Sequence, residues 1–405
     1  MDYNERLKYI NKIINVNNII SEDVMSEIIK LIDQHSTKLL NNLTYADKRI
    51  NLKKNTFYKS KNFEIKLIGK GREAIIYEVI IPETINFVIK KYFEKDSTKD
   101  SDHLRTEIDF AQYIIEIITS KISPHYIVPH PNLIDSNKTI LELGDGQFRE
   151  LIKYNKLNDD QWLSLLFQIS YSFFVLFDKY QIVHNDPNLE NIMYIKTKEN
   201  KIKYSIMDRE IVYNFIIPTF GKLITLTDYG HTRIINHKTG FIEMSHNLFL
   251  GYYSYDLKKF LKHLTKKIVF DISHKYSYEE CKNISKQNND NKLDSFVEDA
   301  LSKIDKYNRR AIEKDKNYYA AYYIFKRRYI KEYPNERHSF PTPKIYHFFY
   351  DFVMDDNYFV DKLVKYFDFY VQKENKNVNP EFIYQTIRSR LDSDITFNTF
   401  LGDIY

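Results

Sequence analysis

The chain contains 405 residues, and its 60 Lys and Arg against 55 Asp and Glu leave a formal net charge of +5. This near balance gives no bulk electrostatic footprint for nucleic acid, so we expect no clear nucleic-acid partner. Apolar residues make up 43% and charged residues 28%, which excludes a wholly disordered chain. The length predicts two to three domains or one large two-lobed unit.

Cysteine usage and apolar runs narrow the class of protein. Cys281 is the only cysteine, which excludes an internal disulfide framework and a Cys-rich metal site and favours a reducing compartment. The amino terminus lacks the charged-then-apolar order of a signal peptide, and no window approaches the ~18 apolar residues that span a bilayer. The most apolar segment, residues 162–177, has charged flanks and is predicted to be a buried core helix. We therefore expect a soluble, cytoplasmic protein without a membrane span.

Residues 1–60 are predicted to form a helical amino-terminal extension with a polar linker. Apolar residues recur from Val24 to Ile32 at helical spacing, with Ser21 before them as N-cap. From Phe63 the pattern changes to the alternation of strands, in FEIKLIGKGREAIIYEVII and then NFVIKKYF, which predicts an antiparallel sheet. One helix, at 101–118, interrupts these strands.

After about Leu151 the pattern is mostly helical to the end of the chain. A strand-like interval from Ile192 to Thr227 breaks it. The order is therefore β-rich and then α-rich, which predicts an α+β fold.

The first chemical signal is a pair of glycines between two predicted strands. The chain has only 9 glycines, and Gly69 and Gly71 flank Lys70 in the string GKGREAII. Glycines there would let the backbone approach phosphates and leave its N–H groups free to donate. A simple hairpin turn explains the same residues equally well.

The next signal is a lysine at the end of an apolar strand. Lys90 closes the string FVIK, and Glu107 follows in the next predicted helix. A buried lysine needs a counter-ion, which Glu107 can supply, and its ammonium group can meet a phosphate. The alternative is that Lys90 is a solvated strand residue.

The string IVHNDPNLENIMYI at 182–195 carries the strongest signal. Its frame places Asp186 and Asn191 five residues apart, after a predicted helix and before a strand. A carboxylate there can accept a proton from a hydroxyl nucleophile, and an Asn amide oxygen can bind Mg²⁺. Asp228 in ITLTDYG offers a further oxygen ligand, with Gly230 letting the chain turn away. Each motif alone could be a capped turn, but together they indicate phosphoryl transfer.

In this order the motifs resemble those of the protein kinase fold over about residues 63–270: GKGREA is similar to the Gly-rich loop, FVIK to VAIK, HNDPNLEN to HRDxxxxN and DYG to DFG. The resemblance implies a two-lobed fold, with a small β-rich lobe at 61–143 and a larger, mostly helical lobe at 144–405. The larger lobe would carry an insert at about 197–222.

The resemblance also implies roles for single residues. Lys90 would bind the α- and β-phosphates of ATP and pair with Glu107, Asp186 would be the base, and Asn191 and Asp228 would hold Mg²⁺. The segment TILELGDG would be the hinge that meets adenine through backbone groups. The residues implied to contact the nucleotide are Gly69, Lys70, Gly71, Ile76, Lys90, Glu142 and Leu143. A later Asp, Asp256, would anchor the backbone of the catalytic loop.

The chain departs from the usual kinase pattern in several places. Asn185 stands where an Arg is usual, which makes switching by loop phosphorylation doubtful. Asn188 stands where Ser/Thr kinases usually carry a Lys near the γ-phosphate, and the loss of that donor would slow the enzyme without abolishing its activity. Asn188 stays among the candidate catalytic residues. Asp228 follows Asn191 by 37 positions, and the segment from His231 to Tyr255 has no APE motif.

The long insert, the HND loop and the helical extension are similar to those of the divergent protein kinases of large cytoplasmic DNA viruses, the poxvirus and giant-virus group. This narrower resemblance implies Ser/Thr phosphorylation of an unknown protein substrate, in host cytoplasm or in the virion. Two alternatives stay open. Small-molecule kinases of the choline and aminoglycoside type share the HxDxxxxN frame, and a pseudokinase scaffold would explain Asn188.

Overall fold

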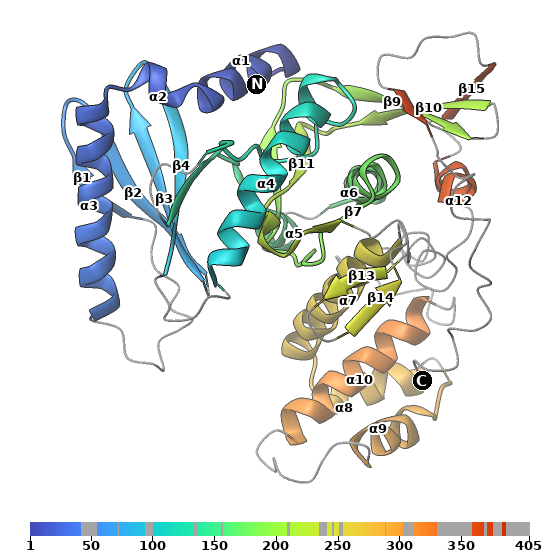
Figure 1. The fold of residues 1–405 in the computed structure, drawn as a ribbon. Coiled ribbons are helices and arrows are strands. Elements are labelled where there is room, and N and C mark those ends of the chain that lie inside the picture. Colours follow the sequence, from blue (N-terminus) through green and yellow to red (C-terminus); the bar gives the residue numbers. More distant parts are fainter. Residues whose placement is uncertain are drawn as a thin grey trace.

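The computed structural model shows an α+β protein assembled from one larger antiparallel sheet, several small sheets and a set of helices (Figure 1). It describes residues 1–41, 55–71, 73–93, 100–132, 137–154, 157–208, 211–234, 241–244, 247–250, 254–287, 289–302, 312–329, 359–367, 371–375 and 383–385. Among these residues no helix has the length and apolar character needed to cross a membrane.

The predicted antiparallel sheet is confirmed. Its strand order follows the chain: β1 (Asn55–Lys59), β2 (Glu64–Lys70), β3 (Ala74–Ile81), β4 (Ile85–Tyr92) and β5 (Lys138–Leu141). The sheet begins at Asn55, within the segment expected to be helix and linker. The pattern did not predict strand β1 because its five residues, NTFYK, are too few to show a repeated alternation of polar and apolar residues, and they follow a polar run.

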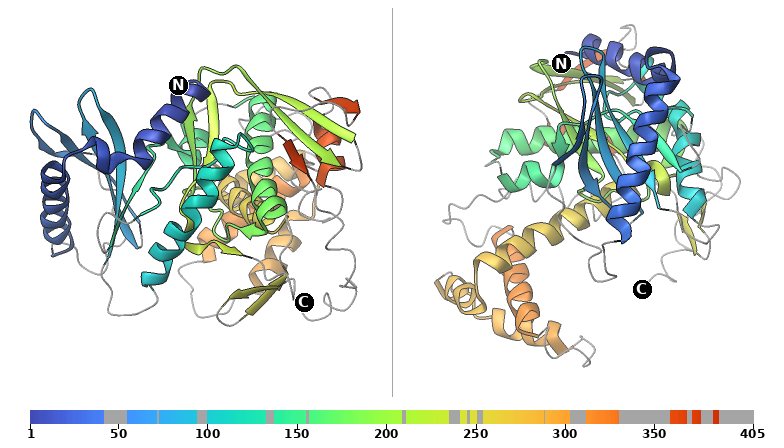
Figure 2. Two further views of the ribbon diagram at one scale, coloured as in Figure 1. Left: turned by 45° about the horizontal axis from the view of Figure 1, so that its top comes forward. Right: turned by 90° about the vertical axis from the view of Figure 1, so that its left-hand side faces the viewer.

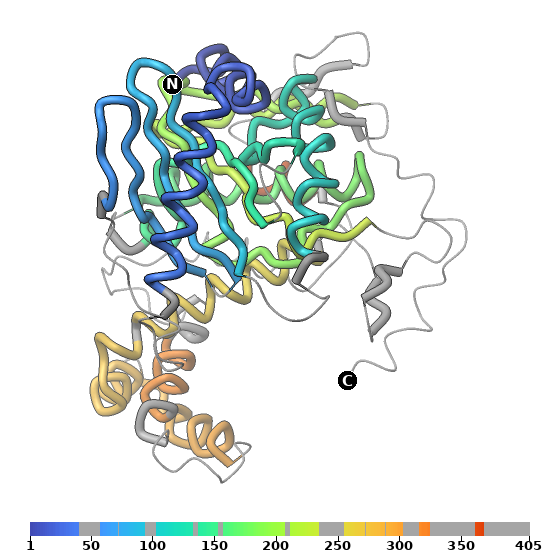
Figure 3. Tube along the Cα trace, turned by 60° about the vertical axis from the view of Figure 1, so that its left-hand side comes forward, coloured from blue at the N-terminus to red at the C-terminus, as the bar shows by residue number. Residues whose placement is uncertain are grey.

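Three helices precede the sheet: α1 (Tyr3–Ile14), α2 (Val16–Ile19) and α3 (Glu22–Asn41). The expected helix after Ser21 is α3, and its apolar face packs on the sheet, where Ile28 and Ile32 share one hydrophobic cluster with Phe63 and Tyr77. Figure 3 shows α3 running along the sheet. The amino-terminal helices are therefore part of the sheet's core.

A second, larger hydrophobic cluster is built around α6 (Asp159–Tyr180). Asn158 caps this helix by accepting from the Gln161 N–H at 2.9 Å. Every residue from Trp162 to Phe177 is buried, which confirms the predicted core helix. Helices α4 (Asp100–Thr119) and α5 (Phe148–Tyr154) contribute residues to the same cluster.

The strand-like interval after the core helix is confirmed as four strands: β8 (Ile192–Lys196), β9 (Lys201–Asp208), β10 (Ile211–Pro218) and β11 (Lys222–Leu226). Strands β11, β8 and the short β6 (Gly146–Gln147) form one sheet. The predicted insert holds the hairpin of β9 and β10. Two late strands, β15 (Val371–Asn375) and β16 (Ile383–Gln385), extend this hairpin into a four-stranded sheet.

The remaining elements are mainly helical. Helices α7 (Ser254–Lys275), α8 (Tyr278–Gln287), α9 (Leu293–Ser302) and α10 (Ile312–Tyr329) follow one another, and α12 (Phe359–Tyr366) comes later. Two short pairs, β7 (Ile182–Val183) with β12 (Arg233–Ile234) and β13 (Phe241–Met244) with β14 (Asn247–Leu250), complete the described strands. Figure 2 shows α8, α9 and α10 projecting from the rest of the chain. Their side chains form a small hydrophobic cluster that buries Cys281.

Candidate functional site

Lys90 stands at the centre of the candidate site. It is buried near the end of β4, and its Nζ lies 3.1 Å from Glu107 Oε2 and 2.7 Å from Asp228 Oδ1. The predicted pairing with Glu107 is therefore present in the structure. Burial alone would lower the pKa of Lys90, but the two carboxylates hold that pKa well above its ordinary value. The lysine is a fixed cation between α4 and the end of β11.

Tyr92 is a member of this cluster that sequence reasoning did not identify. Its hydroxyl donates to Glu107 Oε2, the oxygen that also accepts from Lys90. Tyr92 lies two residues after Lys90, so both side chains leave the same face of β4. That period-two spacing was the signal available in the sequence. Glu107 is completely buried and accepts hydrogen bonds from both Lys90 and Tyr92.

Asp228 follows β11 in a left-handed backbone conformation, with φ of 66°. We expected Gly230 to supply this turn, and the structure corrects that expectation. Gly230 lies in a 3₁₀ turn, η2 (Tyr229–His231), where a Cβ would come within 3.1 Å of the His103 Cβ. Its missing side chain lets α4 approach, while Asp228 itself makes the turn, which short polar residues tolerate.

The predicted catalytic loop is held by amide hydrogen bonds. Asn191 Nδ2 donates to the carbonyl oxygen of Asp186 at 3.0 Å and to its Oδ2 at 2.9 Å. Asn188 Nδ2 donates to the same carboxylate oxygen at 3.0 Å, and its Oδ1 accepts from the N–H groups of Glu190 and Asn191. Asn188 therefore fixes the Asp186 side chain and closes the loop. In this orientation Asn191 Nδ2 faces Asp186, so Asn191 Oδ1 is the atom that could bind a metal ion.

Two hydrogen bonds join this loop to the strand that carries Asp228. The Thr227 N–H donates to the Asn191 carbonyl at 3.0 Å, and His184 Nε2 lies 2.9 Å from the Thr227 carbonyl. Since Thr227 precedes Asp228 directly, the loop and the Lys90 cluster meet at this point. The four residues expected to converge, Lys90, Asp186, Asn191 and Asp228, are thus linked by a continuous chain of contacts.

Asp256 makes the anchoring contact predicted for it. Its two carboxylate oxygens accept from the backbone N–H groups of His184 at 2.6 Å and Asn185 at 2.8 Å. Burial raises the pKa of Asp256, although His184 and the two backbone donors oppose that effect. Asn185 takes a left-handed φ of 63°, which Asn accepts more readily than Arg does. Lys259 donates to the Asn185 carbonyl and secures this turn from α7.

Of the two glycines of the string GKGREAII, Gly69 lies near the end of β2 and Gly71 lies in the turn between β2 and β3. The Gly71 N–H donates to the Ala74 carbonyl at 2.8 Å, and Gly69 pairs with Ile76 across the sheet. Ile76 is half-buried, and it packs together with Ile68, Leu143 and Met193 against the buried Val88 and Leu141. An apolar wall therefore forms beside the hairpin, built from the sheet, the expected hinge and β8.

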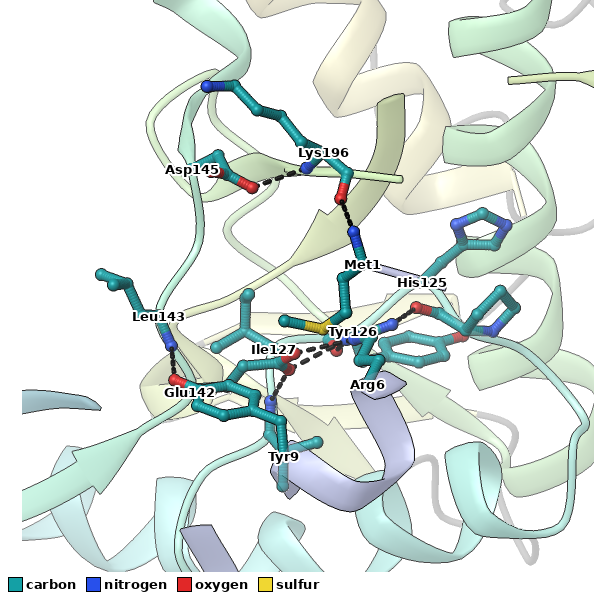
Figure 4. A network of polar contacts seen from close by, with 12 residues as sticks. Met1, Arg6, Tyr9, His125, Tyr126, Ile127, Glu142, Leu143, Asp145 and Lys196 are labelled. Atoms are coloured by element: carbon teal, nitrogen blue, oxygen red, sulfur yellow. Dashed lines mark hydrogen bonds and ion pairs between the residues drawn. The ribbon is translucent and has the colours of Figure 1, made fainter. Parts of the chain in front are cut away.

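The expected hinge, Glu142 and Leu143, is supported from behind by α1 (Figure 4). The Arg6 guanidinium pairs with Glu142 at 2.7 Å in a site where both side chains are almost fully buried. The Leu143 N–H donates to the Tyr9 hydroxyl at 3.1 Å, and the Glu142 N–H donates to the Val128 carbonyl at 2.9 Å. Both hinge N–H groups thus have protein acceptors. Sequence reasoning did not identify Arg6 or Tyr9, whose contacts are long-range.

No protein-family model matches the chain, and no curated protein is significantly similar to it. Any functional assignment therefore depends on the residues and their geometry.

Proposed function

We propose that this chain is an ATP-dependent phosphotransferase of the protein kinase type, which transfers the γ-phosphoryl group to Ser or Thr hydroxyls of a protein with Mg²⁺. The observation that carries the proposal is Lys90, which bridges Glu107 and Asp228 from a buried position. A buried lysine between two carboxylates fits a site that receives a polyanion together with a metal ion. The large and small hydrophobic clusters would then correspond to the two lobes.

The donor set of the site fits Mg²⁺, a hard cation that prefers oxygen ligands. Asn191 Oδ1 and the Asp228 carboxylate would hold it, and 38% of the Asp228 side chain is exposed. Mg·ATP supplies the transferable phosphoryl group. On the protein side, Lys90 would shift part of its contact from Asp228 to the phosphates while keeping Glu107 as counter-ion.

Asp186 would act as the base. Two amides, from Asn188 and Asn191, donate to its Oδ2 and thereby fix the carboxylate. Oδ1 would accept the proton of the attacking hydroxyl as that oxygen bonds to phosphorus and the bond to the ADP oxygen breaks. Asn188 would thus act by positioning Asp186.

The nucleotide base would lie against the apolar wall that contains Ile76, Leu143 and Met193. The N–H groups of Glu142 and Leu143 are engaged on the protein side, so the hinge would meet adenine mainly through carbonyl oxygens, which match its exocyclic amine. The hairpin with Gly69, Lys70 and Gly71 would cover the phosphates.

The test compares wild type with Asp186→Asn. Both proteins are incubated with Mg·ATP and either a generic protein mixture or a panel of amino-alcohols, and nucleotide binding is followed separately by thermal shift. We expect transfer to protein Ser and Thr, a loss of about 10²- to 10⁴-fold in Asp186→Asn, and unchanged nucleotide binding. Asp109→Asn, an exposed change on α4, is the matched control and should retain full activity.

Three results would overturn the proposal. Transfer to small molecules alone would replace the protein kinase assignment with a small-molecule kinase. Nucleotide binding without any transfer by wild type would identify a pseudokinase scaffold. Equal transfer by wild type and Asp186→Asn would refute the role of Asp186.

A further inference from the structure

Three side chains with metal-binding atoms meet beside the candidate site and have no role in the proposed phosphoryl transfer. They are Glu73 in the hairpin between β2 and β3, His103 on α4 and His231 in η2. Their candidate ligand atoms all lie within 4.8 Å of one another, and all three residues are half-buried. Each residue comes from a different element, so no local sequence pattern indicated the group.

The contacts within this group are close. His103 Nδ1 lies 2.8 Å from Glu73 Oε2, and the rings of His103 and His231 have centroids 4.2 Å apart. Gly230 makes the approach of η2 to α4 possible, since the His103 Cβ would lie 3.1 Å from any Cβ at that position. The backbone thus brings two imidazoles and a carboxylate together without a large side chain between them.

We propose that Glu73, His103 and His231 form a Zn²⁺ site that ties the β2–β3 hairpin to α4 and η2. Two His and one carboxylate are a usual donor set for zinc with an open fourth position. In a tetrahedral site with zinc bonds of about 2.0–2.1 Å, ligand atoms lie about 3.3 Å apart. The present ligand atoms lie on either side of this spacing, with His103 Nδ1 2.8 Å from Glu73 Oε2 and all three atoms within 4.8 Å of one another, so binding zinc would require only small side-chain rotations.

Imidazole nitrogen is a common zinc ligand, and this group offers two imidazoles from different elements. The nitrogen donors also distinguish this site from the oxygen ligands at Asn191 and Asp228, which suit Mg²⁺. The two sites should therefore select different ions.

A bound zinc ion would restrain the relative positions of the three elements that supply its ligands. The hairpin that contains Glu73 would be fixed to the helix that carries Glu107 and to the turn that follows Asp228. Zinc would hold these three elements in the arrangement seen here. Binding can be measured without nucleotide, so the inference does not depend on phosphoryl transfer.

The experiment titrates the full-length protein with ZnSO₄ by calorimetry, in the presence of millimolar MgCl₂. We expect one zinc per chain, a higher melting temperature with zinc, and the visible absorption of tetrahedral Co²⁺ when cobalt replaces zinc. His103→Ala and His231→Ala should each weaken zinc binding by at least about 100-fold, more than the loss of a group that only supports a ligand. His231→Cys, which restores a zinc ligand, should retain binding.

Control variants separate this site from the others. His274→Ala removes an exposed histidine on α7 and should bind zinc as wild type does. Asp186→Asn and Asp228→Asn alter the proposed catalytic and magnesium site and should also retain zinc. Circular dichroism verifies that each variant is folded, and His231→Asn replaces His231→Ala if the latter is not.

Three results would overturn the proposal. The first is the absence of a saturable zinc site, and the second is displacement of zinc by Mg²⁺. The third is zinc binding that is lost in Asp228→Asn and kept in His103→Ala.

Discussion

Arg6 and Glu142 form a buried ion pair between residues 136 positions apart in the chain. The Arg6 guanidinium donates to both carboxylate oxygens, at 2.7 and 2.9 Å, and also to the carbonyls of Pro124 and Tyr126. Figure 4 shows Arg6 beside Glu142, which lies in the segment that we expect to bind adenine. The amino-terminal helix is therefore a structural support of the candidate site.

We predict that Arg6→Met destabilises the fold by about 3–5 kcal/mol, because it leaves a buried carboxylate without its cation. The unfolding free energy from urea denaturation measures this change. Lys8→Met, at an exposed position of the same helix, is the matched control and should have little effect. The double variant Arg6→Met with Glu142→Leu should recover part of the loss, since an apolar pair carries no unpaired charge. Equal stability of Arg6→Met and Lys8→Met would show that the Arg6–Glu142 ion pair does not stabilise the fold.

The Lys90–Asp228 pair leads to a prediction for acid stability. Burial would raise the pKa of Asp228, but Lys90 outweighs burial and holds that pKa below its ordinary value. A carboxyl with a depressed folded-state pKa stabilises the fold above its unfolded pKa of about 3.9, and this contribution is lost as the pH falls through the folded pKa. Lys90→Met should therefore lose structure at a higher pH than wild type.

The measurement for this pair is the midpoint of acid unfolding, followed by circular dichroism. Lys59→Met removes a lysine that is 74% exposed and should leave the midpoint where it is in wild type. Lys90→Met should also weaken nucleotide binding, which Lys59→Met should not do. An unchanged acid midpoint in Lys90→Met would show that Lys90 does not stabilise ionised Asp228.

The local motifs could be predicted from sequence because their residues act at short, fixed spacings. The Asp186 and Asn191 side chains meet within one loop, and Lys90 and Glu107 are close in the chain. Burial of the helix at 162–177 followed from its apolar composition alone. These features depend on residue type and local period, which a sequence displays directly.

Other features depend on packing between distant segments and could not be predicted. Nothing in the pattern around Arg6 indicates that it pairs with Glu142, because a single charged residue on a helix is usually solvated. The assignment of the turn to Gly230 followed the general preference of glycine for positive φ. In the structure Asp228 has the positive φ, while Gly230 is required by the approach of α4.

Asp256 should act as a positioning residue for the proposed catalytic loop. Asp256→Asn retains one oxygen acceptor but cannot accept both the His184 and Asn185 N–H groups as a carboxylate does. Hydrogen bonds to charged groups contribute about 1.5–3 kcal/mol each, so we expect a measurable loss of stability. The transfer rate should fall while the KM for ATP stays close to wild type, because the proposed nucleotide contacts lie elsewhere.

The matched control for Asp256 is Asp271→Asn, on the same helix and nearly half exposed. It should retain both stability and rate. A KM increase with an unchanged rate in Asp256→Asn would instead place this residue in nucleotide binding.

His125 allows a prediction for the pH dependence of stability near neutrality. Its Nδ1–H donates to the Ile224 carbonyl at 2.7 Å, and its Nε2 accepts from the Tyr204 hydroxyl at 2.9 Å. Burial, opposed by the Ile224 carbonyl and reinforced by Arg6, lowers the pKa of His125 to about 3. An unfolded His has a pKa of about 6.5. Between these values only the unfolded chain binds the proton.

The unfolding free energy of wild type should therefore fall as the pH falls below about 6.5, and His125 alone contributes a slope of ~1.4 kcal/mol per pH unit. In urea unfolding between pH 6 and pH 5, the unfolding free energy of His125→Gln should depend less steeply on pH than that of wild type, by the contribution of about one proton. The slope should not vanish, because burial also lowers the pKa of His35, His231 and His263. His274→Gln, at an exposed position, should retain the wild-type slope. If His125→Gln retained it too, the proton uptake on unfolding would have to come from other groups.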